Sequence, residues 1–332
     1  MADLTTKYLG LSLSNPLIIG SSGLCDSAEN ILELEKAGAG AVVIKSIFEE
    51  QIMLEVDASL KAAYQNDMIY SAKSETLDYI DVHIRERTLS AYIELIKDVK
   101  KKVMIPVIAS INCVSSAEWT SFANQFEKAG ADALELNIAI LPSDEKTSPE
   151  DIEKLYIDII EKVKSQVNIP VSLKISPYFT NMALMVKKLS ETGVDGIVMF
   201  NRFYTPDYDI NNFEEKSSNT FSKSSESGNV RRWMGILSPK ITCDLAATSG
   251  IHDDEDLIKQ LLAGAKAVQV VSTIYKNGKE QIQKMLKGLN QWMDDKNYNS
   301  IEQFRGKLSQ AESSNPSAYE RIQFMKYFSE IQ

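Results

Sequence analysis

Four segments of the chain repeat one pattern, in which a helical stretch ends at a glycine and a short apolar run follows. They are residues 36–45, 128–137, 192–201 and 262–272. A glycine at this place ends a helix, and the apolar run behind it is typical of a buried strand. Repeated helix–strand units require parallel strands joined by helical crossovers. The pattern therefore predicts an α/β fold.

Further apolar runs begin at a proline, which stops a preceding helix and is tolerated as the first residue of a strand. These runs follow Pro16, Pro106 and Pro170. With them, eight strands are predicted, near Ile18, Val43, Ile108, Leu136, Leu173, Val198, Cys243 and Val270. Continuously apolar parallel strands in that number predict a closed (β/α)8 TIM barrel. An open doubly wound sheet is the alternative, and the lack of an early Gly-x-Gly-x-x-Gly motif counts against it.

Two insertions interrupt the alternation of helix and strand. The first, residues 48–87, follows the second strand and has a partly helical pattern, and the second, residues 203–233, follows the sixth strand and is rich in serine. Active sites of such barrels form after the carboxyl ends of the strands, so both insertions are expected beside the site. We interpret the second as a mobile cover over it, with an inert surface loop as the alternative.

The sequence predicts two parts: residues 1–306 as the barrel and residues 307–332 as a C-terminal helical extension. Aromatic residues recur with helical spacing towards the end of the chain, among them Tyr319, Phe324 and Phe328. Such spacing predicts an amphipathic helix. We expect the extension to pack on the barrel or on a second subunit.

Composition excludes several classes of protein. The net charge of −10 argues against partners such as nucleic acid or an anionic membrane surface. No apolar run approaches the roughly 20 residues that span a bilayer, and the polar N-terminus lacks a signal-peptide core. The few, widely spaced cysteines Cys25, Cys113 and Cys243 fit a reduced, cytoplasmic setting. With two histidines and no close ligand spacing, no metal site is expected.

The residues that close the predicted strands are small, amide-bearing or cationic. They are Ser21, Ser22 and Gly23 after the first strand, Lys45 and Ser46 after the second, Asn112 and Cys113 after the third, Asn137, Lys174, and the pair Asn201 and Arg202. A lysine inside a parallel barrel is costly unless it meets an anion or a hydrogen-bond acceptor. For Lys45 and Lys174 the alternative is a surface residue whose ammonium group reaches water.

The last two strands end in small residues with uncluttered backbone amides. Ser249 and Gly250 follow one strand, and Ser272 and Thr273 follow the other. Amides of this kind form an anion site, and phosphate commonly lies at this place in (β/α)8 barrels. Ordinary turns are the alternative. The whole layout suits a flat, electron-accepting heterocycle with a phosphate tail. A sugar-phosphate aldolase or isomerase would use the same phosphate site.

Several motifs, in order, resemble the dihydroorotate dehydrogenase family. They are N-P-L-I-I-G-S-S-G-L at Asn15, V-I-K-S at Val43, A-L-E-L-N at Ala133, S-L-K-I-S-P-Y-F at Ser172, M-F-N at Met199, A-T-S-G at Ala247 and G-A-K-A-V-Q-V at Gly264. The resemblance implies a (β/α)8 barrel that binds flavin mononucleotide (FMN) and oxidises dihydroorotate to orotate in pyrimidine biosynthesis. It also implies a homodimer and a soluble electron acceptor, with fumarate, nicotinamide dinucleotide and an iron–sulfur partner subunit as the alternatives.

The resemblance assigns roles to residues at the strand ends. By it, Ser21, Ser22, Lys45, Ser46, Asn137 and Lys174 contact the flavin ring and ribityl chain, and Asn112 is a weaker candidate for the same contacts. Ser249, Gly250, Ser272 and Thr273 hold the phosphate. Asn201 faces the substrate, and Lys45 is a second substrate-facing candidate.

The substrate half of the family pattern is changed in this chain. The family's catalytic cysteine or serine lies three residues after the asparagine of the fourth strand, and that position is Ile140, which cannot accept a proton. The asparagine expected two residues later is Pro142. Ser143, Cys113, Tyr204 or a water molecule could replace the base. Three hypotheses remain: a dihydroorotate-like oxidoreductase, a flavin oxidoreductase for a different small anionic substrate, and a non-catalytic flavin-binding protein or phosphate-binding barrel lyase.

Overall fold

Eight parallel strands close into a barrel, as the repeat predicts. A computed structural model describes residues 2–65, 74–112, 116–217 and 220–321. The barrel strands are β3 (Leu17–Ile19), β4 (Ala41–Val43), β6 (Val107–Asn112), β7 (Ala133–Asn137), β8 (Val171–Ile175), β9 (Gly196–Met199), β12 (Asp244–Thr248) and β13 (Ala267–Val270). Each pairs in parallel with its neighbour, and β4 closes the ring by pairing with β6. The two-residue β5 (Ile47–Phe48) also pairs with β6. The (β/α)8 prediction is confirmed.

One strand starts later than its apolar run predicts. The seventh strand was expected near Cys243, yet β12 begins at Asp244 and continues to Thr248. Cys243 is half-buried, whereas Leu245, Ala246 and Ala247 are fully enclosed. The register with β9, in which Asp244 lies opposite Gly196, fixes where the strand begins. Hydropathy locates the apolar run but does not mark the residue at which strand pairing begins.

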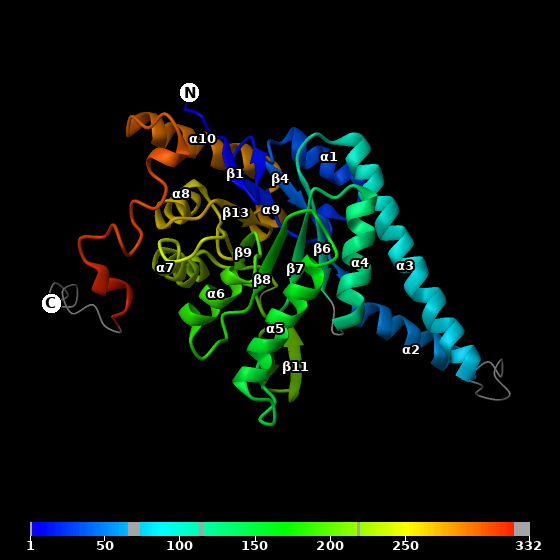
Figure 1. The fold of residues 1–332 in the computed structure, drawn as a ribbon. Coiled ribbons are helices and arrows are strands. Elements are labelled where there is room, and N and C mark those ends of the chain that lie inside the picture. Colours follow the sequence, from blue (N-terminus) through cyan, green and yellow to red (C-terminus); the bar gives the residue numbers. More distant parts are fainter. Residues whose placement is uncertain (1, 66–73, 113–115, 218–219, 322–332) are drawn as a thin grey trace.

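Helices surround the barrel (Figure 1). They are α1 (Ala28–Lys36), α3 (Ser74–Lys102), α4 (Ser116–Ala129), α5 (Pro149–Lys164), α6 (Met182–Glu191), α7 (Ser227–Leu237), α8 (Asp254–Ala263) and α10 (Glu280–Asp295). Local sequence sets their ends. The side chain of Asp253 accepts a hydrogen bond from the amide of Asp256 at the start of α8, and Gly264 ends that helix at φ 117°.

Side chains alternate between two separate apolar layers. One layer lies between the strands and the helices, and the other fills the barrel interior with Ile18, Val43, Ile108 and Val198. The short hairpin of β1 (Thr6–Tyr8) and β2 (Leu11–Leu13) adds Leu9 to the inner layer. This hairpin plugs the amino end of the barrel, so the carboxyl ends of the strands form its open face.

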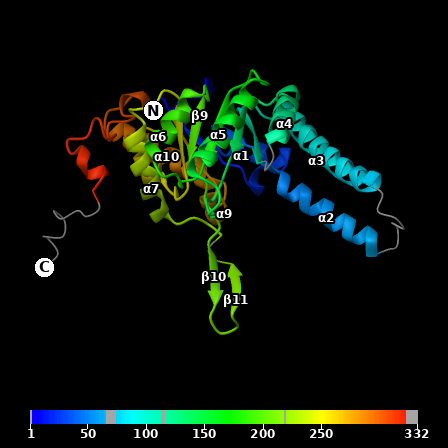
Figure 2. The ribbon, with the colours of Figure 1, turned by 60° about the horizontal axis from the view of Figure 1, so that its bottom comes forward.

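The first insertion is a helical hairpin. It consists of α2 (Glu49–Gln65) and the first part of α3, and it extends from the barrel as an arm (Figures 1 and 2). The many contacts between α2 and α3 hold the two helices side by side. The partly helical pattern of this insertion thus corresponds to real helices.

The second insertion differs from the serine-rich loop that the sequence indicates. Its first part is an antiparallel hairpin of β10 (Pro206–Asp209) and β11 (Glu214–Ser217) that projects away from the barrel (Figure 2). Residues 220–226, which include the 3-10 helix η2 (Ser224–Glu226), return to the barrel, and α7 already begins at Ser227. Only this returning segment, hereafter the strap (residues 220–226), lies where a cover was expected.

The end of the described chain folds back on the barrel. It contains the 3-10 helices η3 (Ile301–Gln303) and η4 (Pro316–Tyr319), and the amide of Gln310 donates to the carbonyl of Gly235 in α7. Residues 307–321 of the predicted helical extension form turns and the 3-10 helix η4 and no α-helix, and residues 322–332 lie outside the described residues. None of the described helices has the length and apolar character needed to cross a bilayer.

Candidate functional site

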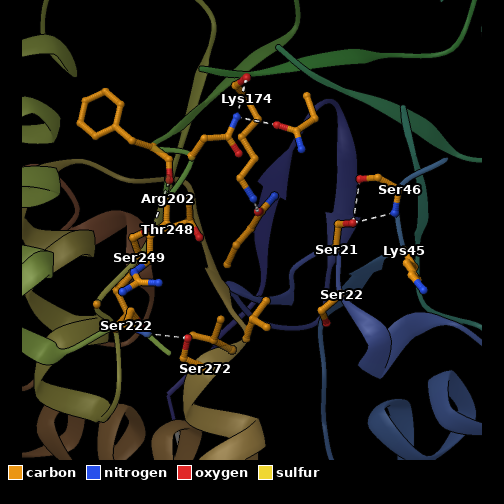
Figure 3. Close-up of a pocket in the computed structure, with 18 of the residues that line it drawn as sticks. Ser21, Ser22, Lys45, Ser46, Lys174, Arg202, Ser222, Thr248, Ser249 and Ser272 are labelled. Carbon is orange, nitrogen blue, oxygen red and sulfur yellow. Dashed lines mark hydrogen bonds between the residues drawn. The ribbon is translucent and has the colours of Figure 1, made fainter. Parts of the chain in front are cut away.

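A cavity of about 380 Å³ lies at the open face of the barrel. It brings together most of the residues singled out in the sequence: Ser21, Ser22, Lys45, Ser46, Asn137, Lys174, Asn201, Ser249, Gly250 and Ser272. Figure 3 shows Arg202, Ser222, Ser249 and Ser272 on one side of this cavity and Ser21, Ser46 and Lys45 on the other. Residues far apart in the chain meet here because parallel strands end at one face.

Two predicted residues do not line the cavity. Thr273 is completely buried in the short helix α9 (Ser272–Asn277), and its hydroxyl donates to the carbonyl of His252 at 2.8 Å. Asn112 ends β6, where it is half-buried, and its side chain is not part of the lining. Strand-end position alone did not separate these two from the residues that face the cavity.

The sequence analysis missed several lining residues. Thr220 and Ser222 come from the strap, and Gln269 comes from the middle of β13. Gln269 could have been found, because a polar residue between Val268 and Val270 in a buried strand needs a partner. Arg202 was noted at the end of β9 but received no role.

A buried polar network forms the floor of the cavity. The ammonium group of Lys174 donates to Oε1 of Gln269 at 3.2 Å, and Nε2 of Gln269 donates to Glu135. The Glu135 carboxylate also lies 3.9 Å from the Lys174 ammonium group, and both side chains are largely enclosed. Because the Gln269 nitrogen donates to Glu135, the amide oxygen of Gln269 is turned towards Lys174. Lys174 is thereby held pointing into the site.

Parity along β7 explains how Glu135 reaches this network. Glu135 and Asn137 are two residues apart in one strand, so both side chains face the barrel interior. Asn137 pairs with Asn201, which follows β9. Nδ2 of Asn201 donates to Oδ1 of Asn137 at 2.5 Å. Nδ2 of Asn201 also donates to the Lys174 carbonyl at 3.4 Å, so the amide pair adjoins Lys174 in the cavity lining.

Hydroxyl groups form the opposite wall. Ser21 and Ser46 share a hydrogen bond of 2.9 Å, and Ser46 shares another of 2.7 Å with buried Ser110. The Tyr92 hydroxyl donates to the Ser110 carbonyl and accepts from the Ser110 amide. Burial raises the pKa of Tyr92, so its phenol stays neutral and can make both bonds. This chain of partners fixes the serine side of the cavity, whereas Lys45 at the rim is exposed.

The turn after β12 has an unusual backbone. Ser249 and Gly250 have φ angles of 76° and 75°. A Cβ atom at Gly250 would lie 2.3 Å from the amide nitrogen of Ser227, so only glycine fits there. A serine in the left-handed region is uncommon, and such strain persists where it serves a site. The turn places small residues beside Ser272 at one end of the cavity.

The charge of the cavity is opposite to that of the chain. Three cationic residues, Lys45, Lys174 and Arg202, line it, and among the described residues no acidic side chain does. The chain as a whole has a net charge of −10. Donors and cations with a polar turn at one end fit a planar molecule carrying a phosphate group. The described residues hold no cluster of histidine, cysteine and carboxylate groups that could bind a metal ion.

The residue expected at the base position, Ile140, lies away from the cavity. Ile140 packs against the outer apolar layer and helps to line a separate hollow beside α5. Of the substitute bases, Ser143 is exposed, and the Tyr204 hydroxyl donates to the carbonyl of Lys216 in β11. Cys113 lies outside the described residues. None of the described candidates for the base therefore lines the cavity.

Comparison with known proteins identifies the family. A family model described as dihydroorotate dehydrogenase matches residues 3–293. Over 317 residues the chain is 26% identical to a protein of Thermoplasma volcanium named dihydroorotate dehydrogenase B (NAD(+)), catalytic subunit, covering 92% of this chain and 98% of that protein. A Saccharomyces bayanus protein named dihydroorotate dehydrogenase (fumarate) is 27% identical over 330 residues, covering 93% and 99%. The chain belongs to the dihydroorotate dehydrogenase family.

Proposed function

We propose that this protein is an FMN-dependent oxidoreductase that oxidises a CH–CH bond of a small anionic substrate, with dihydroorotate as the first candidate. The observation that carries the proposal is the cationic cavity, which has Lys174 on its floor and the Ser249–Gly250 turn at one end. Bound FMN would supply the acceptor for the hydride. The family membership and the names of both relatives support this reaction class.

Each group of cavity residues has its own role in this proposal. Lys174, held by Gln269, offers a positive charge where a reduced flavin would carry its negative charge. The Asn137 and Asn201 amides stand where they can orient a planar substrate, and Lys45 at the rim can attract its anionic group. Amides around Ser249, Gly250 and Ser272 suit the phosphate. Each role uses a group already fixed by a neighbour, except that of Lys45.

Partners and location follow from the same proposal. One relative is named as a catalytic subunit of an NAD(+)-dependent enzyme, and another is named for fumarate. We infer a soluble electron acceptor of one of these kinds, a homodimeric assembly and a cytoplasmic location. Elution volume in size-exclusion chromatography with light scattering tests the assembly directly.

A second candidate is oxidation of a different small anionic substrate. The specific observation in its favour is that Ile140, the residue expected at the base position, packs outside the cavity. Its side chain cannot take a proton. A substrate whose proton is more acidic, or is removed by water, would not need that base. The cationic lining serves either substrate equally well.

An anaerobic titration separates the candidates. Purified protein is first examined for the absorption spectrum of bound FMN, because absence of flavin refutes an FMN enzyme and leaves a phosphate-binding lyase or another use of the barrel. Dihydroorotate is then added without oxygen. Bleaching of the flavin supports the first candidate. An unchanged spectrum at millimolar dihydroorotate excludes it, and bleaching by another small carboxylate then identifies the second.

A further inference from the structure

The strap is fastened to the barrel at one residue by three different hydrogen bonds. The amide of Ser222 donates to the hydroxyl of Ser272 at 3.0 Å. The Ser222 hydroxyl pairs with Nε2 of His252 at 3.1 Å, and its carbonyl accepts from the ammonium group of Lys276 at 2.7 Å. The Ser222 side chain is buried although the residues around it are exposed. This part of the second insertion is therefore built into the site.

Arg202 is held by both ends of the same segment. Its Nε donates to the carboxylate of Glu226 at 2.9 Å, and its Nη1 donates to the carbonyl of Thr220 at 3.0 Å. Glu226 also accepts from the amide of Lys223 at 2.8 Å, which fixes the carboxylate in turn. A guanidinium group fastened at two of its nitrogens has lost most of its rotational freedom before any ligand arrives.

This fastening places the guanidinium group beside the turn of Ser249 and Gly250, hereafter the phosphate turn. A Cβ atom at Gly250 would lie 2.9 Å from the carbonyl oxygen of Lys223 and 2.9 Å from the carbonyl carbon of Glu226. The turn after β12 is thus packed directly against the strap. Arg202 and Ser222 line the cavity together with Gly250, and Figure 3 shows both beside Ser249 and Ser272.

We propose that Arg202 and the strap form a side-chain clamp for the phosphomonoester of the coenzyme, in addition to the backbone amides of the turn. The inference rests on the proposed function, because it concerns the same coenzyme. A phosphomonoester carries a charge of about −1.5 to −2 at neutral pH, and amides offer only partial positive charges. Arg202 adds a planar guanidinium group whose geometry matches phosphate, with its charge partly balanced by the ion pair to Glu226. Lys276, which bonds to Ser222, adds a second cation nearby.

Affinity for FMN and for riboflavin tests the clamp, because riboflavin is the same ring system without the phosphate. Flavin-free protein is titrated with each compound, and binding is followed by quenching of flavin fluorescence. Arg202→Met is expected to weaken FMN binding by about thirtyfold, which is the scale of a hydrogen-bonded charge pair. Riboflavin binding is expected to change by less than about threefold.

Two further variants sharpen the measurement. Lys216→Met removes an exposed cation from β11 in the same insertion and is expected to leave both affinities unchanged. Arg202→Lys, which keeps a charge without the planar fork, should fall between Arg202→Met and the unaltered protein, and it serves if Arg202→Met proves unstable.

The outcomes distinguish the clamp from the function on which it rests. If the unaltered protein binds neither flavin, the proposed function is refuted and the clamp with it. If FMN binds but Arg202→Met loses affinity for FMN and riboflavin by the same factor, or loses none, the clamp is refuted and the proposed function stands. A loss confined to FMN, largest in Arg202→Met, smaller in Arg202→Lys and absent in Lys216→Met, supports it.

Discussion

For Lys174, the sequence predicted that the ammonium group needs an acceptor but not which residue provides it. A lysine between Leu173 and Ile175 in a buried strand predicts a cation that must meet an acceptor, and the structure places it on the cavity floor. Its partner Gln269 lies 95 residues away along the chain. Strand parity gives the side to which a residue points, but the strand that faces it across a barrel depends on closure. The partner was therefore not predictable.

Substitution of Lys174 should slow reduction of the flavin in protein that is still folded. We expect Lys174→Met to slow flavin reduction by about a hundredfold, because a fixed charge near developing negative charge is lost. The unfolding midpoint should also fall, because the buried Glu135 loses its cation and keeps the hydrogen bond from Gln269. Stopped-flow absorbance without denaturant gives the first quantity and urea denaturation the second. Lys187→Met, an exposed change on α6, serves as the control. A folded variant that reduces the flavin at the unaltered rate would contradict the assigned role.

His252 should make the stability of the protein depend on pH. Burial, followed by the nearby ammonium group of Lys276, lowers the pKa of His252, while Asp253 and Asp256 act in the opposite direction. The unfolded chain thus binds the proton more readily, and stability present above about pH 6.5 is lost as the pH falls towards the lowered pKa. We expect His252→Gln to lose less stability between pH 7 and pH 5 than the unaltered protein, as measured by urea denaturation. Equal pH dependence in both would show that His252 does not contribute.

At the scale of elements, the sequence predicted features that depend on residues adjacent in the chain, such as the end of a helix. The glycine that ends α8 is where the sequence predicts it. The hairpin of the second insertion was not predicted, because nearly all of its residues precede the serine-rich stretch and pair only with each other, as Tyr208 does with Glu215. The strap was also hidden, since its attachment to Ser272 and Lys276 depends on tertiary contacts.

The junction of the phosphate turn with α7 yields a prediction with a matched control. Gly250 and Gly193 both have positive φ angles, 75° and 85°, but a Cβ atom would clash with Ser227 at the first and meet nothing within 4 Å at the second. Gly193→Ala should cost about 1 kcal/mol from backbone strain alone. Gly250→Ala should cost about 3 kcal/mol, because the overpacked contact adds to that strain.

Only the first of these two glycines should also matter for the coenzyme. Movement of the turn away from α7 would carry Ser249 with it, so Gly250→Ala is expected to weaken FMN binding and Gly193→Ala is not. Urea denaturation and fluorescence titration measure the two effects on the same samples. The reasoning fails if both alanines cost the same free energy, or if Gly193→Ala is the one that weakens FMN binding.

At the scale of the whole molecule, the barrel separates stability from chemistry along its axis. The amino end is filled by apolar side chains of the β1–β2 hairpin, and the carboxyl end carries the cationic cavity. Composition and repeats predicted the barrel, and strand ends predicted most of the cavity. The plug was not predicted, because two strands of three residues each carry too little hydrophobic periodicity to be recognised.

Substitution of Leu9 tests whether a change at the amino end of the barrel affects the cavity at its carboxyl end. Its side chain is 2% exposed, and it fills the space left by Gly196, where a Cβ atom would lie 2.5 Å from its Cδ2. Leu9→Ala should therefore cost about 3 kcal/mol of unfolding free energy, as for other buried leucines, while half-buried Leu11→Ala in the same hairpin should cost about 1 kcal/mol. Neither change touches the cavity, so FMN affinity should stay within about twofold of the unaltered protein at temperatures where both remain folded. A loss of FMN affinity that tracks the loss of stability would mean that the plug also shapes the open face, and that the inner layer transmits changes along the barrel.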